Sequence, residues 1–134
     1  MAKVQEERKY WNEKIETMPR PELEKLQLER LKEIVKFSYE NSPYYKRSFD
    51  AAGVSPDDIH ELSDLAKFPF INKQTERETQ GVGSFLGELC CVPEEEVVFI
   101  SSSSGSTGVP TISPFTQEDF DEFQDTESRW VWHV

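Results

Sequence analysis

Residues 21–41 carry the longest regular pattern of hydrophobic and polar positions in the chain. Positions three or four residues apart share one side of an α-helix, so the spacing of three to five in this segment predicts a helix with one buried face. Pro21 suits the first turn of that helix, and Pro43 requires it to end. The positions expected on the buried face are Leu23, Leu26, Leu31, Ile34, Val35 and Ser38.

Several shorter helical segments are predicted downstream from capping and stop signals. Residues 44–52 form the first, because Gly53 provides a stop. The serine, proline and two aspartates at 55–58 are typical of a capped turn that opens a short helix. Residues 63–65 predict another single turn, and Asn72 is expected to cap a helix that ends near residue 79.

Residues 96–100 are the segment whose composition best predicts a β-strand, because valine, isoleucine and phenylalanine are enriched in strands. A loop rich in serine and glycine is expected over residues 101–114. Thr116 and Asp119 then resemble a capping box, which predicts a final helix. No helix-stop residue follows, so we expect this helix to continue and the chain to be truncated.

Composition narrows the possible partners. The 134 residues carry a net charge of −11, and residues 51–134 hold 16 acidic but only 4 basic side chains. Binding to nucleic acid or to an anionic membrane surface needs clustered lysine and arginine, so neither partner is expected. A small anion can still bind through backbone N–H groups, which net charge does not reveal.

The two cysteines, Cys90 and Cys91, are adjacent and do not form a disulfide framework. We interpret them as reduced thiols, with a redox or metal-binding role as the alternative. The N-terminus is charged and lacks the apolar core of a signal peptide. No stretch approaches the ~20 apolar residues that span a bilayer, so a cytoplasmic location is expected.

The segment that points to chemistry is the serine- and glycine-rich loop. Its glycines allow a backbone turn that aims successive N–H groups at one point, and its hydroxyls add further donors. This arrangement suits phosphate, whereas the alternative reading is a flexible linker. A P-loop is excluded because its lysine is absent, and a nucleophile elbow is excluded because the glycines have the wrong spacing. The residues expected to bind the phosphates of ATP are Ser103, Ser104, Gly105, Ser106, Thr107, Gly108 and Thr111.

Residues 103–111 resemble the S-S-G-T-T-G-K-P-T phosphate loop of the superfamily of acyl-CoA synthetases, adenylation domains and luciferases. Val109 stands where that loop carries lysine, and Ser106 where it usually carries threonine. Residues 115–119 resemble the Y-T-x-x-D that follows the loop in phenylacetate–CoA ligases. Further stretches resemble that family in the same order along the chain, at residues 10–12, 16–20, 26–31, 42–45, 49–54, 64–70 and 93–98.

The resemblance implies an α/β fold: an N-terminal helical cluster over residues 1–80, then the start of an ATP-binding domain over residues 81–134. It also implies an ATP- and Mg²⁺-dependent ligase that converts an aryl or arylacetic acid into its CoA thioester through an acyl adenylate. The fragment alone is expected to be inactive, and no catalytic residue is assigned in it. No protein-bound metal site is expected in it. A homodimer is the oligomeric state considered for it. The alternative is a non-catalytic binding or dimerisation module with a vestigial loop.

Overall fold

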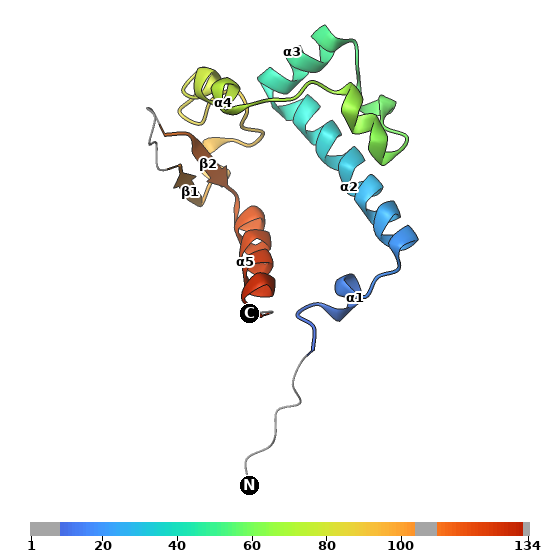
Figure 1. The fold of residues 1–134 in the computed structure, drawn as a ribbon. Coiled ribbons are helices and arrows are strands. Elements are labelled where there is room, and N and C mark those ends of the chain that lie inside the picture. Colours follow the sequence, from blue (N-terminus) through green and yellow to red (C-terminus); the bar gives the residue numbers. More distant parts are fainter. Residues whose placement is uncertain (1–8, 104–109, 133–134) are drawn as a thin grey trace.

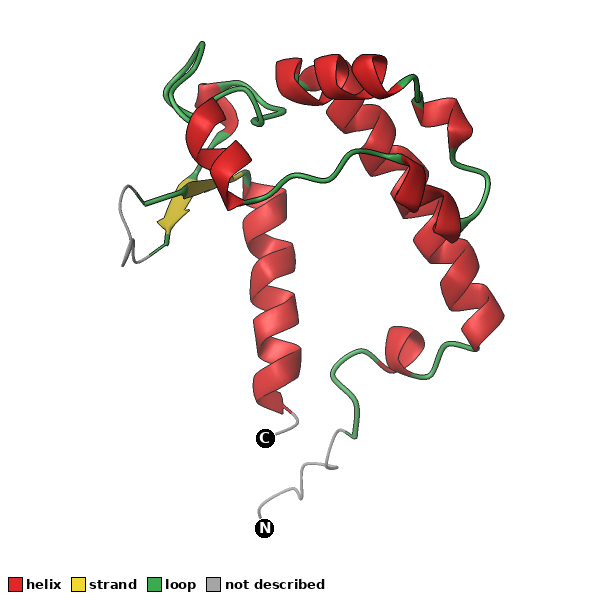
Figure 2. Ribbon diagram, turned by 45° about the horizontal axis from the view of Figure 1, so that its top comes forward, coloured by secondary structure: helices red, strands yellow, loops and turns green. Residues whose placement is uncertain are grey.

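The computed structural model describes residues 9–103 and 110–132. These form an open arch in which α2 and α5 are the two legs, while α3, α4 and a small hairpin lie across the top (Figure 1). Helix dominates, and the only sheet in the described part of the chain has two strands (Figure 2). The helices are α1 (Glu13–Glu16), α2 (Arg20–Asn41), α3 (Pro43–Ala52), α4 (Lys73–Thr79) and α5 (Gln117–Trp132), and the strands are β1 (Phe99–Ser102) and β2 (Ile112–Phe115).

The long helix predicted over residues 21–41 is confirmed as α2. Its predicted buried face is only partly correct. Val35 is buried at 6% exposure, but Ile34 is 55% exposed and lies outside the core. The reason is that α2 is covered mainly where α3 and the two turns after it pack against it.

The core is a small cluster beneath α2 and α3. It consists of Val35, Phe49, Ile59 and Phe68. The rings of Phe49 and Phe68 meet edge to face with centroids 5.0 Å apart, a favourable aromatic geometry. This cluster fixes α3 and the following turns against α2.

The joint between α2 and α3 is made by Ser42, which is 1% exposed. Its Oγ accepts a hydrogen bond from the N–H of Tyr45 at 3.2 Å and so caps α3. The same hydroxyl donates to the carbonyl of Glu88 at 2.7 Å. Gly53 ends α3 with a φ of 68°, as predicted. One buried hydroxyl therefore connects the helical cluster to the segment after α4.

The predicted turns at 55–58 and 63–65 are 3₁₀-helices, η1 (Pro56–Asp58) and the longer η2 (Leu62–Lys67), which has six residues. Asp64 holds η2 together. Its Oδ2 accepts from the backbone N–H groups of His60 at 2.8 Å and Glu61 at 2.9 Å. Lys67 lies 2.7 Å from its Oδ1. The lysine contact and these two N–H bonds hold the pKa of the Asp64 carboxyl well below its usual range.

The strand predicted over residues 96–100 is displaced. Residues at its start form a single 3₁₀ turn, η3 (Glu94–Glu96), and the strand runs instead over β1. It pairs antiparallel with β2, which the sequence did not predict, with Phe99 opposite Phe115 and Ser102 opposite Ile112. Because of this pairing, Ser101 and Ser102 belong to β1 and Ser113 belongs to β2. The loop is therefore shorter than the expected 101–114.

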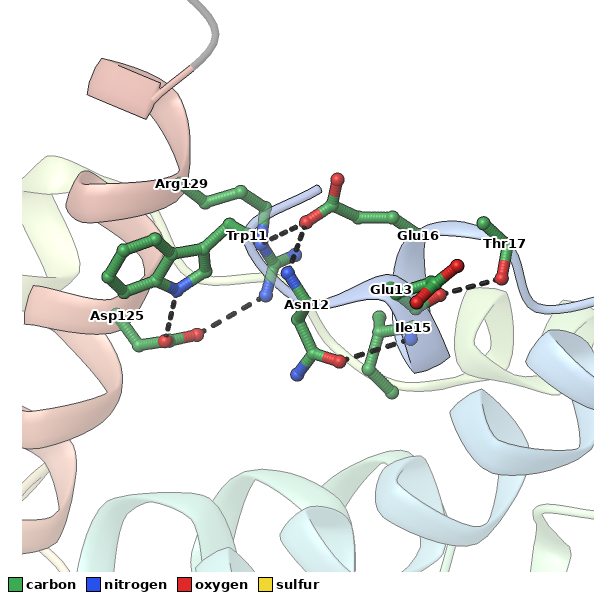
Figure 3. Close-up of polar contacts among 8 residues, drawn as sticks. All are labelled: Trp11, Asn12, Glu13, Ile15, Glu16, Thr17, Asp125 and Arg129. Carbon is green, nitrogen blue, oxygen red and sulfur yellow. Dashed lines mark hydrogen bonds and ion pairs between the residues drawn. The ribbon is translucent and has the colours of Figure 1, made fainter. Parts of the chain in front are cut away.

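Helix α5 begins with the predicted capping box. The N–H of Thr116 donates to Oδ2 of Asp119 at 3.0 Å, and the N–H of Asp119 donates back to the Thr116 hydroxyl at 3.2 Å. At its other end α5 contacts α1 (Figure 3), where Arg129 pairs with Glu16 at 4.0 Å and with Asp125 at 3.3 Å. The end of α5 is thus linked to α1, the short helix that precedes α2.

Candidate functional site

The site predicted from sequence lies at the tip of the β1–β2 hairpin. Its two ends, Ser103 and Thr111, face each other directly after the last strand pair. The N–H of Ser103 donates to the carbonyl of Thr111 at 3.0 Å. Ser104, Gly105, Ser106, Thr107 and Gly108 lie outside the described residues. The structure therefore places the stem of the predicted phosphate loop, and the stem alone.

A second set of bonds joins the same two residues through their side chains. Oγ of Ser103 accepts from the backbone N–H of Thr111 at 3.1 Å and from its hydroxyl at 3.2 Å. Thr111 is buried at 8% exposure. Backbone and side-chain bonds therefore close the stem between these two residues.

Gln80, which follows the end of α4, binds the edge of this stem that faces away from β1. Its Nε2 donates to the carbonyl of Pro110 at 3.2 Å, and its Oε1 accepts from the N–H of Ile112 at 3.0 Å. The two bonds flank Thr111 on both sides. Sequence reasoning missed this residue, because a lone glutamine carries no local signal for a contact to a distant backbone.

Gln80 is itself held by a tight loop. The carbonyl of Thr79 accepts from the N–H groups of Val82 at 3.1 Å and Glu88 at 3.3 Å. Gly87 has a φ of 80°, and a Cβ built at this position would lie 2.5 Å from that carbonyl oxygen. A residue without a side chain is therefore required where this loop passes behind α4.

A cavity of about 300 Å³ lies between α4, the cysteine segment and β2. Cys90 and Cys91 are both free and half-buried at its wall. Burial raises the pKa of the Cys91 thiol, which keeps it protonated and weakly nucleophilic. Within residues 9–103 and 110–132, no cluster of three or more histidine, cysteine or acidic side chains could hold a metal ion. The metal-binding alternative for the cysteines thus gains no support.

Curated relatives match most of the chain. It is 49% identical over 115 residues to the phenylacetate–coenzyme A ligase of Escherichia coli strain K12, and 45% identical over 119 residues to that of Aromatoleum evansii. These matches cover 86% and 89% of the chain. The chain is similar to phenylacetate–CoA ligases along most of its length. No family model matches the sequence.

The chain spans about a quarter of the length of these phenylacetate–CoA ligases, 25% and 26%. Solved structures of another CoA ligase are similar to the chain as well. One is a 2-hydroxyisobutyryl-CoA ligase in complex with 2-HIB-AMP, which matches with a TM-score of 0.83 and 28% sequence identity. The match covers 98% of this chain and 27% of the ligase chain. The same enzyme with 2-HIB-AMP and CoA matches with a TM-score of 0.84 and 30% identity. The predicted fold, that of part of an adenylate-forming CoA ligase, is confirmed.

Proposed function

We propose that this chain supplies the triphosphate-binding hairpin of an ATP-dependent aryl- or arylacetate–CoA ligase. The single observation that carries the proposal is the closed stem: Ser103 and Thr111 join by backbone and side-chain bonds at the base of the predicted loop. A fixed stem holds the two ends of the predicted loop before the ligand arrives, and N–H groups that are positioned in advance stabilise developing charge. Identity to phenylacetate–CoA ligases supports the choice of reaction.

In this reaction a carboxylate oxygen of the acid attacks the α-phosphorus of ATP and releases diphosphate. The CoA thiol then attacks the acyl carbonyl of the adenylate and releases AMP. The proposed role of residues 103–111 is to hold the β- and γ-phosphates so that the leaving diphosphate stays in line. Since Val109 replaces the family's lysine, this contact would depend on N–H groups and hydroxyls.

Mg²⁺ enters this proposal only as the ion that accompanies ATP, because the described residues contain no acidic or histidine cluster for it. The division into a helical region over residues 1–80 and an ATP-binding region over 81–134 is part of the same proposal. So are a cytoplasmic location and a homodimer. No helix in the described part of the chain is long and apolar enough to cross a bilayer.

The decisive experiment is calorimetric titration of ATP into the complete protein encoded by the gene. Replacing Ser104 and Thr107 together by alanine should weaken ATP binding by about tenfold, because two phosphate donors are lost. Thr126→Ala, on the exposed surface of α5, is the matched control and should bind like the parent protein. Unchanged affinity in the double variant would favour the binding or dimerisation module with a vestigial loop.

The acid is identified by a second assay. Coenzyme A consumption by the complete protein, followed with a panel of aromatic acids, should be fastest with an aryl or arylacetic acid. Consumption only with short aliphatic acids would contradict the aryl part of the proposal while leaving the phosphate site intact.

A further inference from the structure

Both the nitrogen and the oxygen of the Gln80 carboxamide bind backbone groups at the start of β2. Nε2 reaches the carbonyl of Pro110 and Oε1 reaches the N–H of Ile112. The partners fix the orientation of the amide, since a carbonyl requires a donor and an N–H requires an acceptor. The side chain thus acts as a short piece of neighbouring strand.

The residue between these two contacts is Thr111. Its carbonyl and N–H point the other way, to Ser103, in bonds of 3.0 and 3.1 Å. The backbone at Thr111 is therefore bound on both edges, by Ser103 on one and by Gln80 on the other. A change in the Gln80 side chain would release one edge and leave the Ser103 bonds alone to position the stem.

Gln80 is itself held in place by hydrogen bonds to the helical cluster. The N–H of Gln80 donates to the carbonyl of Glu76 at 3.0 Å, which keeps it attached to α4. The loop behind it reaches α3 through Glu88, whose carboxylate receives two bonds of 2.8 Å from Arg47. Bidentate pairs of this kind are geometrically specific, so Gln80 is fixed by the helical cluster and not by the hairpin alone.

We propose that Gln80 is a positioning residue for triphosphate binding: it transmits the placement of α4 to Thr111 and so fixes the stem of the loop that holds the β- and γ-phosphates. This inference rests on the proposed function. It adds that the helical cluster contributes to nucleotide affinity without touching the nucleotide. The expected signature is selective, because AMP lacks the two phosphates that the stem would hold.

The test measures the affinity of the complete protein for ATP, for inorganic tripolyphosphate and for AMP. Gln80→Leu keeps the volume and removes both hydrogen bonds, and it should weaken ATP and tripolyphosphate by about fivefold or more while AMP binds as before. Gln80→Glu keeps the acceptor for Ile112 and should also lose ATP affinity selectively. Gln74→Leu is the matched control, since Gln74 is exposed on α4 and its side chain donates to Glu78 on the same helix.

The outcomes separate the two proposals. Equal weakening of ATP and AMP, or no change in either, would overturn the role of Gln80 while the Ser104 and Thr107 result still supports the loop. If the parent protein binds ATP no more tightly than AMP and is indifferent to tripolyphosphate, the phosphate loop itself is wrong. A circular dichroism melt of each variant shows whether it is folded, and a Gln80→Leu protein that fails to fold leaves Gln80→Glu to decide.

Discussion

The indole Nε1 of Trp11 donates a hydrogen bond to Oδ1 of Asp125 at 2.5 Å, which joins the N-terminal segment to α5 across 114 positions (Figure 3). The Trp11 ring also lies against Trp132, with ring centroids 5.7 Å apart. Together with the Arg129–Glu16 pair, this contact links α1 to the last turns of α5. The final helix is therefore held at both ends, by its capping box and by this contact.

Replacing Trp11 by phenylalanine should destabilise the protein by about 0.5–1.5 kcal/mol, because the ring remains but the hydrogen bond to Asp125 is lost. Urea unfolding of the two proteins measures the difference. Trp130→Phe is the control: Trp130 is 69% exposed, so the same chemical change should leave the midpoint in place. Equal shifts in both variants would show that the Asp125 bond contributes nothing.

Ser42→Ala should cost about 1–2 kcal/mol of stability, because the cap of α3 is lost and the Glu88 carbonyl loses its buried donor. Denaturant unfolding followed by circular dichroism measures this cost. Ser48→Ala, in the middle of α3, is a matched control and should be neutral or slightly stabilising, since alanine is the better helix former. A neutral Ser42→Ala would mean that the link between the helical cluster and Glu88 is dispensable.

Gly87→Ala should destabilise the protein more than Gly83→Ala, by about 1–3 kcal/mol. The two glycines have nearly the same φ, 80° and 76°, so the backbone cost of an added side chain is similar. At Gly87 the new Cβ would meet backbone atoms of Thr79 and Gln80, with the Thr79 carbonyl oxygen nearest, whereas nothing lies within 4 Å at Gly83. Thermal melts of both variants separate the two effects, and equal melting temperatures would refute the close approach.

Acid should remove the contribution of Asp64. Its folded-state pKa is lowered by Lys67 and by two backbone N–H groups, so the charged carboxylate stabilises η2 at neutral pH. That contribution is complete above the unfolded-state pKa of about 4 and is lost as pH falls through the lower folded-state value. Asp64→Asn should therefore be less stable than the parent at pH 7, with a gap that narrows toward pH 2. A gap that stays constant with pH would contradict the assignment.

The helices were largely predictable because their signals are local. The Asn72 cap and the Thr116–Asp119 capping box each lie within four residues of the bonds they make, so the sequence contains the whole motif. The proline and glycine that bound α3 act in the same way. Helix starts and stops therefore followed from short stretches of chain.

The hairpin and its anchor were not predictable in the same way. Strand β1 is set by its partner, which lies beyond the loop, and β2 contains Pro114, which argues against a strand when read locally. Gln80 reaches groups 30 and 32 positions away, with no motif at either end. The loop motif indicated where chemistry is expected, but not what holds it in place.

The register of the hairpin also decides where its sheet could grow. Along an antiparallel strand, successive N–H groups point alternately toward the partner and away from it. On the outward side of β2, the N–H of Ile112 is already bound by Gln80, and the next outward position is Pro114, which has no N–H. The outer edge of β2 therefore has no N–H group at these two positions that could pair with another strand. Any additional strand is expected to pair with β1.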